Sequence, residues 1–96
     1  MITVKEIILK CVKSVGKDQK NKDLISPQLK TKLFGDNLDS AGIVFLITEV
    51  EEAISKNLNF DIVLADERAM SQKTSPFRNV ETLIAYTEKL ISKKKN

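Results

Sequence analysis

The sequence predicts an all-α fold, a four-helix bundle of three long helices and one short third helix. Three stretches place apolar residues three and four positions apart, which is the spacing of one helix face. No stretch alternates apolar and polar residues for long enough to build a sheet. At 96 residues, the chain is expected to form one domain over 1–96, with frayed ends at 1–2 and 93–96.

The first predicted helix starts after Thr3, whose hydroxyl can cap it, and Gly16 is placed to end it. Cys11 lies within the apolar stripe and is therefore expected to be a core thiol rather than a reactive one. The stripe consists of Val4, Ile7, Ile8, Cys11, Val12 and Val15. Residues 17–39 are polar and are expected to form a packed loop, with one helical turn within 28–33.

The second predicted helix covers roughly 40–55. Phe45 falls on its polar side, where an aromatic ring either contacts a partner or folds over its own helix, and the sequence leaves both open. The apolar face of this helix carries Ile43, Leu46, Ile47, Val50 and Ile54.

The remaining pattern predicts a short helix that opens near Ala65 or Asp66, a break at Pro76, and a last helix capped by Asn79. The apolar stripe of the last helix is Val80, Leu83, Ile84, Thr87, Leu90 and Ile91.

Composition argues against an enzyme and against a metal site. The chain has no histidine, which excludes Ser-His-Asp and Cys-His nucleophiles and zinc sites that need imidazole. One cysteine cannot form an intrachain disulfide, and neither a signal peptide nor a membrane-spanning run is expected. We therefore expect a cytoplasmic, non-catalytic monomer without membrane insertion.

The net charge of +3 hides an uneven distribution. Residues 34–61 hold six acids and one base, while the rest of the chain holds fifteen bases and seven acids. The lysines have no aromatic residues between them and no nucleic-acid motif beside them, so solvated lysine faces are favoured over nucleic-acid binding.

Ser40 is the hydroxyl best placed for covalent modification. It follows Asp39 at the start of the second predicted helix. A phosphate diester there would face backbone N–H groups and the positive end of the helix dipole.

The segment 33–40, LFGDNLDS, is followed by Glu51 and Glu52, by Phe60-Asp61-Ile62 and by Phe77-Arg78-Asn79-Val80. With these motifs the chain resembles the acyl carrier protein family, and its run 65–77 resembles the specialised stand-alone bacterial carriers. The resemblance implies that a phosphopantetheinyl transferase attaches 4′-phosphopantetheine from coenzyme A to Ser40, beside Asp39 and Gly42. The arm would carry acyl groups as thioesters to acyl-loading, acyl-transfer or condensing enzymes of fatty acid, polyketide or related lipid biosynthesis.

The resemblance also implies a partner surface on the second helix, formed by Asp36, Asp39, Val44, Phe45, Glu51 and Glu52. The family often has acids where this chain has Gly42 and Phe45, so recognition is expected to be partly apolar. Glycine near a helix start is unfavourable by up to about 1 kcal/mol, which suggests close approach by the arm or a partner at Gly42.

Acyl chains in this family fold back between the helices. The corresponding candidates for a pocket are Leu46, Ile47, Val50, Ile62, Ala65, Met70 and Tyr86, each of which is first a candidate core residue. Two alternatives remain open: an aminoacyl or peptidyl carrier of the same fold, and a helical interaction module that never receives the cofactor.

Overall fold

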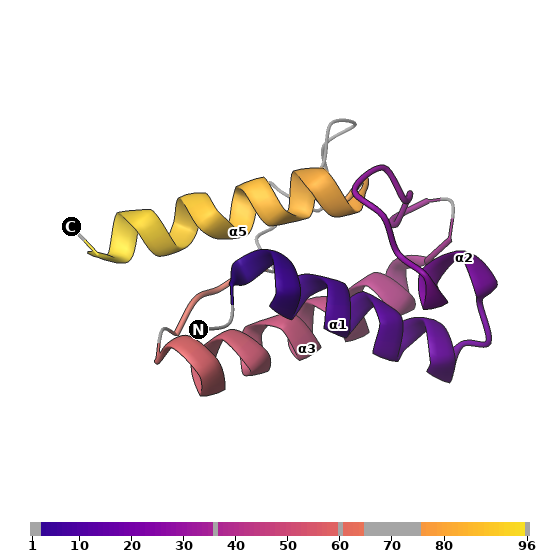
Figure 1. Ribbon diagram of the computed structural model, residues 1–96, viewed down its shortest axis with the longest axis horizontal. Helices are drawn as coiled ribbons and strands as arrows, with labels where there is room; N and C mark the ends of the chain where they lie inside the picture. Colours follow the sequence, from indigo (N-terminus) through magenta and orange to yellow (C-terminus); the bar gives the residue numbers. More distant parts are fainter. Residues whose placement is uncertain (1–2, 36, 60, 65–75, 96) are drawn as a thin grey trace.

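The computed structural model describes residues 3–35, 37–59, 61–64 and 76–95, with the backbone alone at 40, 94 and 95 (Figure 1). This part of the chain is mostly helical and contains no strand, only isolated bridges. The all-α class is therefore confirmed. The helices are α1 (Val4–Asp18), α2 (Lys22–Ile25), α3 (Ser40–Leu58) and α5 (Val80–Lys95). The short helix expected near 65–70 lies outside the described residues.

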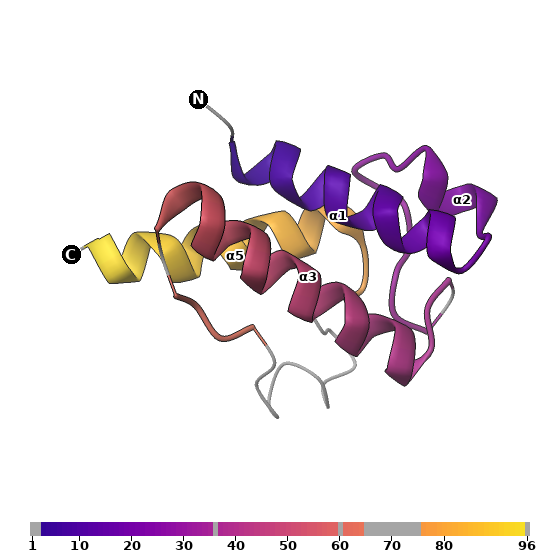
Figure 2. The ribbon, with the colours of Figure 1, turned by 90° about the horizontal axis from the view of Figure 1, so that it is seen from below.

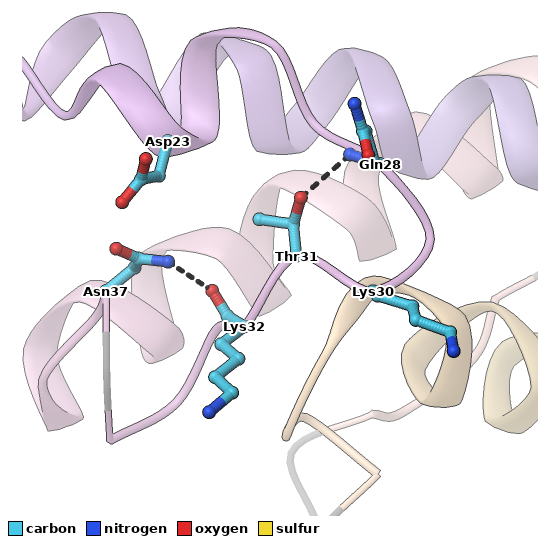
Figure 3. Close-up of a pocket in the computed structure, with 6 residues that line it drawn as sticks. All are labelled: Asp23, Gln28, Lys30, Thr31, Lys32 and Asn37. Carbon is cyan, nitrogen blue, oxygen red and sulfur yellow. Dashed lines mark hydrogen bonds between the residues drawn. The ribbon is translucent and has the colours of Figure 1, made fainter.

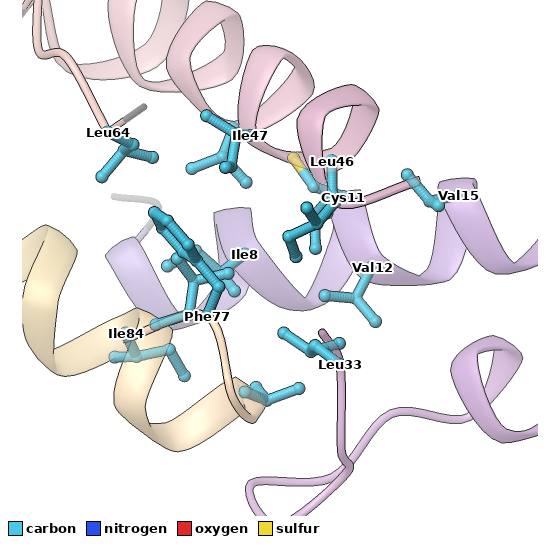
Figure 4. Close-up of a cluster of buried hydrophobic side chains, with 14 of the residues drawn as sticks. Ile8, Cys11, Val12, Val15, Leu33, Leu46, Ile47, Leu64, Phe77 and Ile84 are labelled. Atoms are coloured by element: carbon cyan, nitrogen blue, oxygen red, sulfur yellow. The ribbon is translucent and has the colours of Figure 1, made fainter. Parts of the chain in front are cut away.

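Helix α1 is the centre of the packing because it contacts α2, α3 and α5 (Figures 1 and 2). Figure 4 shows how the space between the helices is filled, with Phe77 lying between Ile8 of α1, Ile84 of α5 and Leu64. These side chains belong to one cluster of buried apolar residues drawn from all four helices and their connections. The predicted stripes of α1, α3 and α5 all face this cluster.

The start of α1 agrees with the prediction, but its end does not. The Glu6 N–H donates to the Thr3 hydroxyl over 3.2 Å, which is the expected cap. Gly16, however, is buried within the helix, which continues to Asp18. The actual stop is a Schellman arrangement, in which Lys20 has φ of 55° and its N–H donates to the Lys17 carbonyl.

Gly16 is small because α2 packs directly against it. A Cβ atom at this position would lie 2.6 Å from the Leu24 Cβ and 2.9 Å from the Ile25 backbone nitrogen. The expected loop therefore contains helix α2, capped by the Asn21 side chain, and the helical turn predicted within 28–33 is not found. Leu24 is fully buried against α1.

Helix α3 runs further than predicted, and α5 runs into the lysine tail as predicted. α3 continues to Leu58 and stops at Asn59, which adopts the left-handed conformation with φ of 58°. At the start of α5, Asn79 is the predicted cap: its side-chain oxygen accepts the Thr82 N–H at 2.8 Å. The Thr82 hydroxyl in turn accepts the Asn79 N–H, which completes a reciprocal capping box.

Candidate functional site

The loop that leads to Ser40 is paired with the start of α5. The N–H groups of Val80 and Glu81 donate to carbonyls of Thr31 and Leu29, over 3.0 and 2.8 Å. In the opposite direction, the Leu33 N–H donates to the Arg78 carbonyl at 2.8 Å. These bonds satisfy N–H groups that the first turn of α5 cannot satisfy itself. They also hold the loop against the core.

A tight turn then brings the chain from Leu33 to the start of α3. Gly35 has φ of +94°, which only glycine adopts without strain, and its N–H donates to the Leu38 carbonyl. The Leu38 N–H donates back to the Leu33 carbonyl at 3.0 Å. Because Leu33 and Leu38 are both buried, the two ends of the turn are fixed.

A second set of bonds connects this turn to α2. The Asn21 side-chain amide donates to the Asn37 carbonyl at 3.3 Å, and the Asn37 amide donates to the Lys32 carbonyl at 2.6 Å. Asn37 and Lys32 line an open depression of about 420 Å³, shown in Figure 3, together with Asp23, Gln28, Lys30 and Thr31. The Lys30 and Lys32 side chains point in different directions there, and the Thr31 hydroxyl accepts the Gln28 N–H at 2.8 Å. The polar groups of this depression therefore maintain the loop that precedes the serine.

Ser40 is the first residue of α3, directly after the helix cap. The cap is Asp39, whose exposed carboxylate accepts the Gly42 N–H at 2.8 Å. Helical geometry gives the N–H groups of Ser40 and Ala41 no acceptor within the helix. The start of α3 therefore presents backbone donors and the positive end of the helix dipole.

Gly42 is buried, and its own chain explains why it is small. A Cβ atom there would lie 3.0 Å from a methyl carbon of Leu38 and 3.0 Å from the Gln19 side-chain nitrogen. The expected approach of an arm or a partner at Gly42 stays a prediction, since neighbouring side chains already make this position tight.

The exposed face of α3 is apolar near the serine. Val44 is 45% exposed and Phe45 is 46% exposed, and Ala41 is exposed one turn earlier. Glu52 is exposed two turns further along. About half of the surface of Phe45 is thus covered by its own chain, and contact with a partner stays a prediction.

Glu51 has an internal contact in addition to its expected place on the partner surface. Its carboxylate accepts the Leu64 N–H at 2.6 Å. One turn later, the Ser55 hydroxyl donates to the Asp61 carboxylate at 3.1 Å. The two bonds attach residues 61–64 to α3 and place Leu64 in the core. The sequence gives no signal for this role because the partners are thirteen residues apart.

The described candidates for an acyl pocket are core residues. Leu46, Ile47 and Val50 are at most 1% exposed, and Ile62 is 6% exposed. Tyr86 packs against the same cluster with its ring edge-on to Phe77, at a centroid distance of 6.1 Å. Ala65, Met70 and the partner candidate Asp36 lie outside the described residues. Entry of an acyl chain among these side chains stays a prediction.

Cys11 is a buried thiol, as its place in the α1 stripe predicts. Burial, assisted by the negative charge of Glu49, raises the pKa of this thiol from 9.0 to about 11. The thiol is therefore protonated at neutral pH and is a weak nucleophile.

Among the described residues no group of three or more metal-binding side chains comes together, and no helix is long and apolar enough to cross a membrane. No protein-family model matches the chain, and no curated protein or solved structure matches it significantly.

Proposed function

We propose that the protein is an acyl carrier that bears 4′-phosphopantetheine on Ser40. The observation that carries this proposal is the position of Ser40 as the first residue of a nineteen-residue helix, directly after its aspartate cap. The Asp39 carboxylate accepts a hydrogen bond from the Gly42 N–H, while the N–H groups of Ser40 and Ala41 have no acceptor within the helix. A phosphate diester supplies the oxygen atoms that such donors bind.

The loop before Ser40 favours the same role. A swinging arm needs an attachment point that does not itself move, so that the position of its far end is set by the arm and the partner. The bonds from Leu33 to Arg78 and from Asn21 to Asn37 tie the approach to Ser40 to α5 and α2. The bound arm supplies a thiol, with an ordinary pKa of about 8.5, that forms thioesters with acyl groups. The protein itself contributes the attachment and the surface.

The α3 face that follows the serine is the proposed surface for partner enzymes. Val44 and Phe45 are both nearly half exposed, and Glu52 adds negative charge on the same side. Aromatic side chains are enriched in protein interfaces. Recognition by a transferase or an acyl-transfer enzyme would therefore combine apolar contact with acidic residues.

Intact-mass measurement tests the attachment. The purified chain is incubated with coenzyme A and a promiscuous phosphopantetheinyl transferase, and we expect one added phosphopantetheine. Ser40→Ala should abolish the addition, whereas Ser14→Ala, an exposed serine of α1, should not. No addition to the unaltered chain, or an addition that persists in Ser40→Ala, would refute the proposal.

Phe45→Glu tests the surface. We expect this variant to be loaded with the arm more slowly and to transfer its acyl group to the cognate enzyme with a higher KM. The control is Ser14→Glu, which places the same charge at an exposed position of α1, away from the proposed surface. Unchanged kinetics of Phe45→Glu would show that the ring is an ordinary exposed residue.

A further inference from the structure

The face of α1 that points away from the core is basic. Lys10, Lys13 and Lys17 are all exposed, and at 100° per residue they fall within about 60° of one another. The buried side chains of α1 lie on the opposite side of the helix: Ile7, Ile8, Cys11, Val12 and Val15. Glu6 is the acid one turn before this lysine stripe. Over roughly 10 Å of helix, three positive charges thus face solvent together.

The part of the chain that contains this stripe has a net charge of the same sign. Residues 3–32 hold eight lysines and three acids, which gives a net charge of +5. The described residues of 37–61 hold five acids and one lysine, which gives −4. The basic part consists of α1, α2 and their connections, and the acidic part contains α3 with Ser40. A negatively charged partner would therefore be attracted to the α1 side and repelled from the α3 side.

We propose that the lysine stripe of Lys10, Lys13 and Lys17 binds the surface of anionic lipid bilayers. Lysines close to an anionic membrane each add to the attraction, and the attraction decays within a Debye length of about 10 Å at 0.1 M salt. The inference goes beyond the proposed carrier function and does not depend on it. For a carrier of acyl groups it would place the molecule at a membrane while α3 stays accessible.

The side chains of the basic part favour a lipid surface over nucleic acid. Residues 3–32 contain no arginine and no aromatic residue. Specific reading of bases and stacking on them depend largely on those two residue types. Lysines act as point charges, which suits a planar surface whose headgroups move laterally.

The binding is peripheral. The exposed large apolar side chains of the described residues are Leu29, Val44, Phe45 and Val63, and none of them lies on α1. Without an apolar anchor on this face, attraction to a bilayer is electrostatic and sensitive to salt.

Co-sedimentation of the full chain with vesicles tests the proposal. The vesicles contain phosphatidylcholine with about one third phosphatidylglycerol, or phosphatidylcholine alone. We expect binding to the anionic vesicles at low salt, at least tenfold weaker binding when salt is raised well above 0.1 M, and none to the neutral vesicles. The triple variant Lys10→Gln, Lys13→Gln and Lys17→Gln should reduce binding at least tenfold. Circular dichroism checks that it remains folded.

The matched control removes three exposed lysines elsewhere: Lys56→Gln, Lys89→Gln and Lys93→Gln. Both triple variants lower the net charge from +3 by three, to zero. A difference in vesicle binding between them therefore shows that the position of the lysines matters and not only the total charge. We expect the control to bind within twofold of the unaltered chain. Equal loss in both variants, binding to neutral vesicles, or tighter binding to duplex DNA than to anionic vesicles at the same salt would overturn the proposal.

Discussion

Gly16→Ala adds one methyl group at the closest approach of two helices. The new Cβ would meet the Leu24 Cβ at 2.6 Å, the Leu24 carbonyl carbon at 2.8 Å and the Ile25 nitrogen at 2.9 Å. Ordinary contacts begin at 3.4 Å, so the nearest pair must separate by about 0.8 Å. Two of the three atoms are backbone, and no change of rotamer moves them. Relief therefore requires displacement of α2 from α1.

The cost can be estimated from two opposing terms. Overpacking of a well-packed core costs about 1–3 kcal/mol, while alanine gains about 1 kcal/mol over glycine within a helix. Because the clash involves backbone atoms, we take the overpacking cost near the upper end of its range. The free energy of unfolding should then decrease by about 1–2 kcal/mol. For a domain of this size that lowers the Tm by roughly 4–15 °C.

Thermal and urea unfolding, followed by circular dichroism, measure the effect. The control is Ser14→Ala, an exposed position of the same helix where the added propensity should stabilise slightly. Equal or greater stability of Gly16→Ala would refute the close packing of α2 on Gly16. It would indicate that Gly16 is an ordinary interior glycine of α1.

Three further predictions follow from single positions. Lys20→Gly should stabilise the protein by up to about 1 kcal/mol in urea unfolding, because Lys20 has φ of 55°; no gain would argue against this end of α1. Glu51→Ala should cost about 1–3 kcal/mol and speed hydrogen exchange at the Leu64 amide, whereas Glu51→Gln, which keeps an acceptor oxygen, should cost less. Cys11 should resist thiol reagents at pH 8 until denaturant is added; rapid reaction of the folded chain would contradict its burial. Since its pKa rises from 9.0 to about 11 on folding, the unfolded thiol ionises first, and its contribution to stability should be lost as pH increases through that range.

The long helices could be predicted from sequence because each buries one stripe of its own residues. The burial of Ile8 and Val12 in α1, or of Leu83 in α5, can be predicted from the spacing of apolar residues within the helix. α2 could not be predicted in the same way. It has four residues and one buried side chain, Leu24, so no period can be read, and it exists where Gly16 leaves room for it.

A glycine near a helix end led to the wrong boundary of α1. Gly16 suggested a helix stop on the basis of conformational freedom, but its role is close packing against Leu24. The stop itself uses Lys20, a residue without a strong preference for the left-handed region. Rules for helix ends consider the conformational preference of single residues. They do not include how closely another helix approaches, which determines the role of Gly16.

The candidate site also has one part that local sequence predicts and another part that depends on contacts between distant residues. The pair Asp39-Ser40 and the helix that follows it are local in sequence, so the pattern is enough to predict where this helix starts. What holds the approach to that serine is non-local: Asn21 bonds to Asn37 across sixteen residues, and Leu33 bonds to Arg78 at the start of α5. Because the capping box of α5 and the loop share the same stretch of backbone, damage at Asn79 would reach the start of α3 through these bonds. The start of α3 can therefore be predicted from its neighbours in sequence, whereas the contacts that hold the loop before it come from parts of the chain that no motif around Ser40 includes.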